Sequence, residues 1–566
     1  MNTVQLSRRQ FMQLGAAAGW AAGQGLPHWT PVSPGSPEWE PSAQTDPFLQ
    51  LALMQGFEDH AVQAWPIGMR LTVELDRVDS NEWVKKLGTD VRVHNLFHDA
   101  SRTWATLSLH PEALFRLHRQ GLSQCFRSHL WGAPWRHTEN QLMLGSNGSA
   151  KATKPVIEHR LACEAHRSAT GQRVLVIDHG FALAHLSESG QTYLHHASHA
   201  HNRPAAWAPA YSHGAQTLGL FLQFSASHRG LAPTPLLLYE LPDALLGSVP
   251  LGALWPDILD AVAWGICHAQ AGEQLVVLLS VVSSDGSRHP QSFVSRSARA
   301  LQRHAKGLGV ELIWVMAAGN QHQAQQHLRY QVRPGQAAVW QWDLPHQNTQ
   351  ATFLECWHDA SAGAPKVMFK PPGQAWQSSG HGVISAWRQE DSGKIQTVFR
   401  LPATCSSQPD QKTALAGPWG VRWQAPGGAT ELDVNLSMMS SDQAGPFRQA
   451  KLYHDSDSSA NPLQIQSLSG LVPHMTGVWV AQALGQGHAG WLVANPRPDQ
   501  LSGYSGRWPM GHDLHGLQSA GACVDPSRLW AGLNVTSVHG HRMHRASGTS
   551  MAVPLVAAGL MSGRLG

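Results

Sequence analysis

A serine set among small residues lies near the C-terminus of the chain. Ser550 stands in the segment Ser547-Gly-Thr-Ser-Met-Ala-Val-Pro554, and an apolar run follows it. This pattern predicts a tight turn that enters a buried helix, because proline is tolerated where the first helical N–H groups have no partner. A serine at such a helix start lies in a positive field that would stabilise an oxyanion. By itself, the segment also fits a loop that caps an ordinary helix.

An acidic residue ends a run of aliphatic residues. The segment Arg173-Val-Leu-Val-Ile-Asp178 predicts a central parallel strand that is buried on both faces. Asp178 would then lie at the carboxyl end of the strand, where open α/β sheets hold their functional sites. The alternative is an aspartate that caps the next turn.

One histidine begins a predicted helix downstream of this strand. His213 and Gly214 precede an apolar stretch that continues to Phe224. The chain contains 34 histidines, so abundance cannot choose among them and the context of each has to. Its position after the Asp178 strand and at a helix start makes His213 the candidate base, with a structural histidine as the alternative.

An asparagine follows a further predicted strand. Asn320 ends the segment Met316-Ala-Ala-Gly-Asn320, directly after the strand predicted at residues 312–315. An amide is a neutral donor, so it could stabilise the oxyanion of a tetrahedral intermediate without a charge that must be desolvated. The alternative is an ordinary turn residue.

In this chain order, the four segments resemble the motifs of the subtilisin-like serine peptidases, the subtilases. The resemblance covers roughly residues 165–320 and 467–566. It implies a catalytic triad of Asp178, His213 and Ser550, with Asn320 and the backbone N–H of Ser550 in the oxyanion hole. If the pKa of the His213 ring is unperturbed, activity should fall below about pH 6.5.

The resemblance also implies a substrate-binding strand end, at Ser280, Val281 and Val282. The two valines replace residues that are often small, which implies a narrower pocket for the residue before the scissile bond. The chain departs from the family elsewhere too. His179 stands where a small hydroxyl residue is usual in the family. The two residues after Gly214, Ala215 and Gln216, also differ from those that are commonest at these positions in the family.

The elements that must position these residues alternate between strand and helix. Aliphatic runs predict strands at 235–239, 275–279 and 312–315, and apolar helices lie between them at 254–271 and 291–306. We therefore predict an α/β fold: a subtilisin-like doubly wound parallel sheet, with an N-terminal α+β propeptide-like domain and an inserted β-sandwich.

The segment before the sheet divides into four parts. Residues 1–25 resemble a twin-arginine export signal, and residues 26–64 read as a linker. The order βαββα predicts a ferredoxin-like domain at 65–135, which resembles a subtilase propeptide in this place; a permanent accessory domain is the alternative. Residues 136–164 have the composition of an exposed, cleavable linker.

The catalytic unit itself is predicted in two pieces. Residues 165–320 form the first and 467–566 the second, and the alternating runs of 321–466 predict the β-sandwich between them. Its tryptophans suit a hydrophobic core or a binding surface. Among the six cysteines, Cys356 and Cys405 are the predicted disulfide, and Cys267 is predicted to be a buried thiol.

Composition narrows the function classes. Charged residues make up 14% of the 566 residues and the net charge is +3, which argues against a disordered chain and a nucleic-acid-binding surface.

We predict an exported serine endopeptidase, periplasmic or secreted, that is made as a self-processed zymogen. It would act on proteins or peptides, without a permanent membrane span. No cofactor is expected to be required; some subtilases bind structural calcium, but we identify no ligand cluster or other metal site. The alternative is a catalytically silent scaffold that serves as an extracytoplasmic binding protein.

Overall fold

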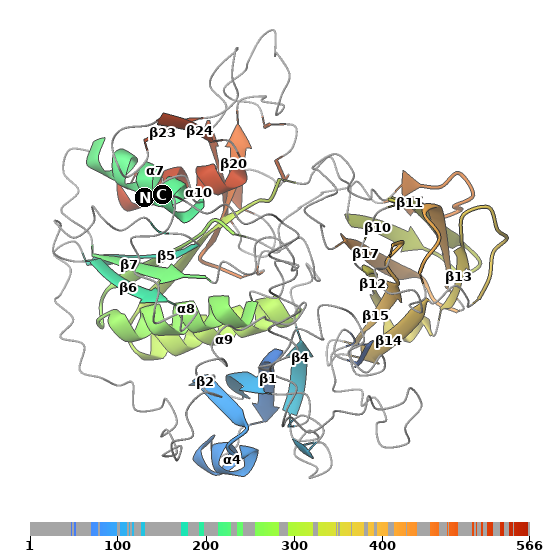
Figure 1. Ribbon diagram of the computed structural model, residues 1–566, viewed down its shortest axis with the longest axis horizontal. Helices are drawn as coiled ribbons and strands as arrows, with labels where there is room; N and C mark the ends of the chain where they lie inside the picture. The colour runs from blue at the N-terminus through green and yellow to red at the C-terminus, as the bar shows by residue number, and fades with distance from the viewer. Residues whose placement is uncertain are drawn as a thin grey trace, which may run out of the picture.

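The computed structural model of the chain forms three units, namely a central α/β unit, a small N-terminal sheet and a β-sandwich (Figure 1). It describes residues 47, 50–51, 69–76, 80–98, 102–109, 113, 116–117, 126–130, 171–178, 181, 192–196, 213–227, 235–241, 255–281, 292–320, 327–346, 348, 351–363, 365–378, 383–389, 393–405, 413–425, 427–438, 453–462, 473, 475–484, 501–502, 505–506, 511–512, 518–523, 533–536, 543–546 and 548–563.

The central sheet has eight strands in the order β21-β22-β20-β9-β8-β5-β7-β6. Neighbouring strands are parallel, apart from the antiparallel pair of β21 and β22 at one edge. After β5, the chain forms β6 and β7 on one side of that strand. It then crosses to the other side of β5, where it forms β8 and the strands that follow. Doubly wound sheets bind ligands at the carboxyl ends of the strands where the order reverses, so a site is expected at the ends of β5 and β8. The bounds are β5 Gln172–Asp178, β6 Thr192–His196, β7 Leu236–Glu240, β8 Gln274–Leu279, β9 Glu311–Ala317, β20 Val478–Leu484, β21 Gly511–His512 and β22 Gln518–Cys523.

Helices cover both faces of this sheet. Because side chains alternate along a strand, Val174 and Val176 of β5 face α7 and α10, while Leu175 and Ile177 face α8 and α9. The helices span α7 His213–Ser227, α8 Trp255–His268, α9 Phe293–Gly307 and α10 Thr549–Met561. The predicted strands and helices of this region are present, with ends within three residues of those expected.

A buried ion pair joins β5 and β8 at the end of the sheet where both strands begin. Arg173 and Glu273 are bonded through Nε and Oε2 at 2.9 Å and through Nη2 and Oε1 at 3.2 Å. Their side chains are only 1% and 2% exposed. Loss of one partner from such a pair is strongly destabilising. The pair therefore fixes the register of the two strands whose carboxyl ends carry Asp178 and Ser280.

The N-terminal unit is an antiparallel sheet of four strands in the order β2-β3-β1-β4. Its elements are β1 Met69–Asp76, α4 Ser80–Leu87, β2 Val91–His98, β3 Arg102–Leu109 and β4 Phe126–Leu130. Residues 113, 116 and 117 are helical. The order is thus βαββαβ, one strand more than the predicted βαββα.

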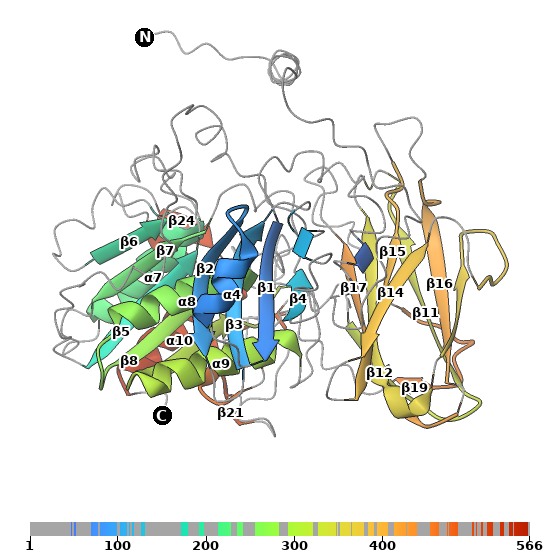
Figure 2. The same cartoon turned by 90° about the horizontal axis from the view of Figure 1, so that it is seen from below.

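This small sheet packs on α8 and α9, on the side of those helices that faces away from the central sheet (Figures 1 and 2). Trp104 is 1% exposed and lies 5.9 Å from Phe293 of α9, measured between ring centroids. Glu74 is 3% exposed and pairs with Arg296 of α9 at 2.9 Å. An aromatic cluster and a buried ion pair therefore hold the N-terminal unit in place.

The inserted unit is a sandwich of two antiparallel sheets, with orders β14-β15-β12-β17-β10-β19 and β13-β16-β11-β18. Trp340, Trp342, Trp419 and Trp423 are at most 1% exposed and form its core. Trp387, in contrast, is 58% exposed. The strands are β10 His327–Val332, β11 Ala337–Leu344, β12 Thr352–Asp359, β13 Lys366–Lys370, β14 Ile384–Gln389, β15 Lys394–Leu401, β16 Gly417–Gln424, β17 Thr430–Met438, β18 Tyr453–His454 and β19 Asn461–Pro462.

The structure corrects both cysteine predictions. Cys356 and Cys405 are not joined by a disulfide. Cys356 lies in the sandwich core opposite Thr397 of β15, whereas Cys405 is exposed beyond the end of that strand. Cys267 is exposed, and not the buried thiol that was predicted. It follows the buried Ile266 on α8, and one residue along a helix turns the side chain by about 100°.

No helix in the part of the chain that the structure describes is long and apolar enough to cross a membrane.

Candidate active site

Three of the predicted site residues lie at the carboxyl ends of neighbouring strands. Asp178 ends β5, Ser280 follows the last residue of β8, and Asn320 lies three residues beyond β9. β8 pairs with β5 on one side and with β9 on the other. Paired strands lie about 4.8 Å apart, so these three positions form a row along the carboxyl end of the sheet.

Asp178 bonds to the predicted base. Its Oδ1 is 2.7 Å from Nδ1 of His213, the first residue of α7. The Asp178 side chain is fully buried, while that of His213 is 29% exposed. An ionised carboxylate at Nδ1 selects the tautomer with its proton on Nδ1, which leaves Nε2 as the basic nitrogen.

The pKa of His213 is raised above its ordinary value. Burial acts to lower it, because burial disfavours the charged ring. The negative charge of Asp178 and its hydrogen bond act in the opposite direction, and together they outweigh the burial. The buried carboxylate therefore makes the ring a stronger base.

Thr217 is a second partner of the same carboxylate. Its hydroxyl lies 3.0 Å from Oδ2 of Asp178 and 3.1 Å from the carbonyl oxygen of Gly214. Thr217 lies four residues after His213 on α7, and residues four apart lie on the same face of a helix. One helix face thus supplies a partner to each oxygen of Asp178.

Ser550 is the second residue of α10, which Gly548 caps. Gly548 has a φ of +121°, a conformation that favours glycine. The Ser550 hydroxyl donates to the carbonyl oxygen of Ser280 at 2.8 Å. Ser550 is thereby placed at the end of β8, beside the strand end that holds Asp178 and His213. The helices α7 and α10 lie side by side on this face of the sheet (Figure 1).

Asn320 is held by the residue that precedes Ser550. Its Oδ1 accepts the backbone N–H of Thr549 at 2.8 Å and the Thr549 hydroxyl at 3.1 Å. The same hydroxyl accepts the N–H of Gly319 at 3.0 Å. Since Oδ1 faces these donors, Nδ2 is the half of the amide available to donate. Asn320 as a whole is exposed.

The predicted pocket residues have different outcomes. The backbone of Ser280 contacts Ser550 directly. Val281 is 6% exposed and packs into the hydrophobic core shared with α8 and α9. Val282 and His179 lie outside the described residues. The structure thus brings five of the predicted site residues to the carboxyl end of the central sheet, namely Asp178, His213, Ser280, Asn320 and Ser550.

Two threonines of the site were missed by the sequence analysis. Thr217 anchors Asp178, and Thr549 anchors Asn320. A signal was present for the first, because Thr217 is spaced four residues from a histidine at a helix start. For the second, the only signal was its place between Gly548 and Ser550.

No group of three or more histidine, cysteine or acidic residues that could hold a metal ion occurs among the described residues.

Comparisons with known proteins give distant similarities. Neither a protein-family model nor a curated protein sequence matches the chain. Among solved structures, the CspB protease of Clostridium perfringens is similar with a TM-score of 0.46 and 14% identity, over 69% of this chain and 82% of that chain. The epidermin leader peptide processing serine protease (EpiP) of Staphylococcus aureus gives a TM-score of 0.32 and 13% identity, over 87% of each chain. At such low scores, we base the function on the geometry of the site.

Proposed function

We propose that the chain is a serine endopeptidase of the subtilisin-like type, which hydrolyses peptide bonds through an acyl-enzyme. The observation that carries this proposal is the row of strand ends. The buried Asp178 and the partly exposed His213 lie at the end of β5, and Ser550 lies at the end of the adjacent β8. A base, the group that orients it and a nucleophile on neighbouring strand ends are what acyl transfer requires.

In the proposed reaction, Nε2 of His213 accepts the proton of Ser550 as its oxygen attacks the peptide carbonyl. The imidazolium then donates that proton to the leaving amine, and a water molecule repeats the sequence to release the acyl group. Asp178 remains ionised throughout and stabilises the imidazolium. The raised pKa of His213 favours the first proton transfer.

The hydroxyl of Ser550 has to turn before it can attack, because it donates to the Ser280 carbonyl. In the subtilases that the chain resembles, the corresponding strand end pairs with the extended backbone of the substrate. A substrate N–H that binds the Ser280 carbonyl would take the place of the hydroxyl and release it toward His213.

Asn320 and the backbone N–H of Ser550 would stabilise the oxyanion. Thr549 engages Oδ1 of Asn320, so the amide is already oriented with Nδ2 as the donor. A donor that is fixed before the reaction stabilises the developing charge without a reorganisation cost.

We further propose that the protein is exported as a zymogen. The N-terminal sheet would be the propeptide, held on α8 and α9 until the linker at 136–164 is cut. Residues 1–25 would direct export to the periplasm or the medium. The substrates would be proteins or peptides, and the mechanism needs no cofactor.

Covalent labelling combined with intact mass tests the proposal. An activated phosphonate should add once to the wild-type protein, at Ser550, and not to Ser550→Ala or His213→Ala. Ser562→Ala, at the other end of α10, is the matched control and should label normally. Wild-type protein should also lose the residues before about 165, while Ser550→Ala keeps them. A folded wild-type protein that neither labels nor processes would support the catalytically silent scaffold instead.

A further inference from the structure

The carboxylate of Asp178 is held from two directions by the same helix. Oδ1 contacts His213 at the start of α7, and Oδ2 contacts Thr217 one turn later. Asp178 is fully buried and Thr217 is 1% exposed. A buried carboxylate that is shielded from water depends on protein donors to fix its rotamer and to keep it ionised.

Thr217 has one hydroxyl hydrogen and two acceptors within reach. One is Oδ2 of Asp178 and the other is the carbonyl oxygen of Gly214, at nearly equal distances. The ionised carboxylate is the stronger acceptor, because hydrogen bonds to a charged partner are roughly twice as strong as neutral ones. The hydrogen therefore goes mainly to Asp178.

The sequence next to Asp178 also bears on which hydroxyl bonds its carboxylate. The residue that follows it, His179, replaces the small hydroxyl residue expected by resemblance. The hydroxyl of Thr217 on α7 reaches this carboxylate.

We propose that Thr217 is a positioning residue for the proposed hydrolysis, and that its hydroxyl holds the Asp178 carboxylate in the orientation that bonds His213. The inference rests on the proposed function. Thr217 itself contacts neither the substrate nor the reacting atoms, so it acts only through Asp178 and His213. Its loss should lower kcat and leave KM nearly unchanged.

The first test is kinetic. Thr217→Val removes the hydroxyl and keeps the shape of the side chain, and kcat should fall roughly ten- to a hundredfold with KM within twofold. Thr217→Ser keeps the hydroxyl and should retain activity within about threefold of wild type. Ser225→Ala is the matched control, because the Ser225 hydroxyl lies on the same helix and has no hydrogen-bond partner among the described residues.

The second test needs no activity. In a Ser550→Ala background, the pKa of His213 is followed by NMR of labelled histidines, with His213→Ala used to assign the signal. Without the hydroxyl the carboxylate turns away from Nδ1, so Thr217→Val should lower the pKa of His213, because burial then acts with less opposition. Thr217→Ser should leave it unchanged. If Thr217→Val does not fold, Thr217→Ala removes the same hydroxyl and should give the same result.

The outcomes separate the two proposals. A wild-type protein without hydrolase activity contradicts the proposed function, while the pKa comparison still decides the role of Thr217. The positioning role is wrong if Thr217→Val keeps both kcat and the pKa of His213. It is also wrong if the serine and valine variants lose activity equally, because packing of the methyl group would then be responsible.

Discussion

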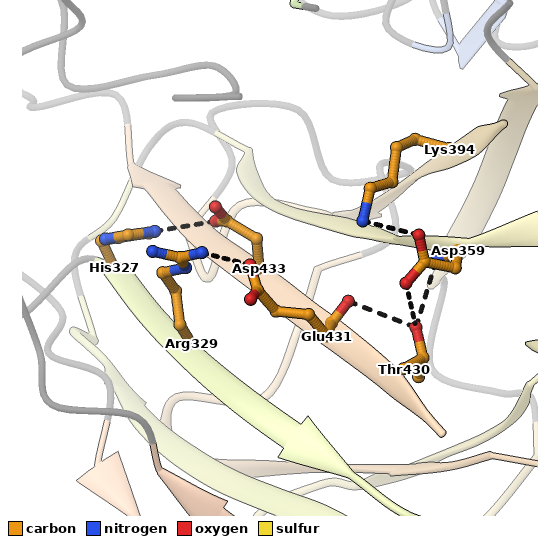
Figure 3. Close-up of polar contacts among 7 residues, drawn as sticks. All are labelled: His327, Arg329, Asp359, Lys394, Thr430, Glu431 and Asp433. Atoms are coloured by element: carbon orange, nitrogen blue, oxygen red, sulfur yellow. Dashed lines mark hydrogen bonds and ion pairs between the residues drawn. The ribbon is translucent and has the colours of Figure 1, made fainter. Parts of the chain in front are cut away.

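Two histidine–carboxylate pairs of equal length lie in different units of the molecule. In the central unit, Nδ1 of His213 is 2.7 Å from Oδ1 of Asp178. In the sandwich, Nε2 of His327 is 2.7 Å from Oδ1 of Asp433, on the outer face of the six-stranded sheet (Figure 3). By distance alone, either pair could orient a general base.

The surroundings of the two pairs differ. The His213 side chain is 29% exposed and lies at the carboxyl end of the central sheet, next to the strand end that holds Ser550. The His327 side chain is 5% exposed and lies among charges, beside Arg329 and its partner Glu431 (Figure 3). A neighbouring hydroxyl nucleophile and a partly exposed ring therefore distinguish the candidate base. A short bond to a carboxylate does not.

Replacement of each histidine by alanine gives the largest contrast. His213→Ala should lower kcat on a peptide substrate by roughly a millionfold, because no base remains for Ser550. His327→Ala should leave kcat within twofold of wild type and should destabilise the sandwich by about 1–3 kcal/mol, through a lost partner of Asp433. Peptide hydrolysis and thermal unfolding measure the two effects. Comparable loss of activity in both variants would contradict the distinction.

Asn320 tests the oxyanion donor separately from the base. Asn320→Ala should lower kcat about a hundred- to a thousandfold, because Nδ2 is lost. Asn348 of the sandwich provides the control, since its amide is buried and bonds to Thr352; Asn348→Ala should leave kcat unchanged. A loss of less than threefold in Asn320→Ala would remove this residue from the oxyanion hole.

The candidate site could be predicted from the sequence because each residue follows a local pattern. Asp178 follows a run of four aliphatic residues in β5, His213 begins an apolar helix, and Asn320 follows a buried strand. The anchoring hydroxyl of Thr217 was missed although it lies four residues after His213, because the resemblance that paired His213 with Asp178 assigned no role to this position. Sequence spacing alone does not show that α7 lies over the end of β5.

The fold was predicted well where burial is continuous, as in β8, whose last five residues are buried. The disulfide prediction failed because pairing depends on register. Cys356 lies opposite Thr397, and the sequence contains no signal for that register. For Cys267, apolar residues dominate α8, so the sequence does not show which face of the helix is exposed.

The pH profile tests the environment of His213 directly. Since its pKa is raised by Asp178 despite burial, the acidic limb of kcat/KM should have its midpoint above the ordinary value of about 6.5. Below that midpoint, activity should fall about tenfold per pH unit, because the protonated ring cannot accept the serine proton. A pH profile of peptide hydrolysis from pH 5 to 9 gives the midpoint. A limb below pH 6.5, or a flat profile, would mean that His213 is not the base.

The smallest effect is expected for an ion pair of the sandwich. Lys394 bonds Asp359 at 2.7 Å, and Thr430 also reaches this carboxylate (Figure 3). Burial acts to raise the pKa of Asp359, but the hydrogen bond and charge of Lys394, together with hydrogen bonds to Thr430 and to the backbone of Glu431, outweigh it and the pKa is lowered. The pair therefore stabilises the fold above the ordinary pKa of the carboxyl group, and this contribution is lost as the pH falls through the lowered pKa.

Lys394→Met should consequently reduce stability by less than about 1 kcal/mol at pH 7, because the Asp359 side chain is 35% exposed and solvent screens the pair. The difference from wild type should shrink as the pH falls through the lowered pKa of Asp359, and it should disappear once Asp359 is protonated in both proteins. Denaturant unfolding followed by the fluorescence of the buried sandwich tryptophans measures it. Lys366→Met, at an exposed lysine on the other sheet, is the control. A difference that persists unchanged after Asp359 is protonated would mean that Lys394 stabilises the sheet by packing of its aliphatic stem, and that the charge of Asp359 contributes nothing.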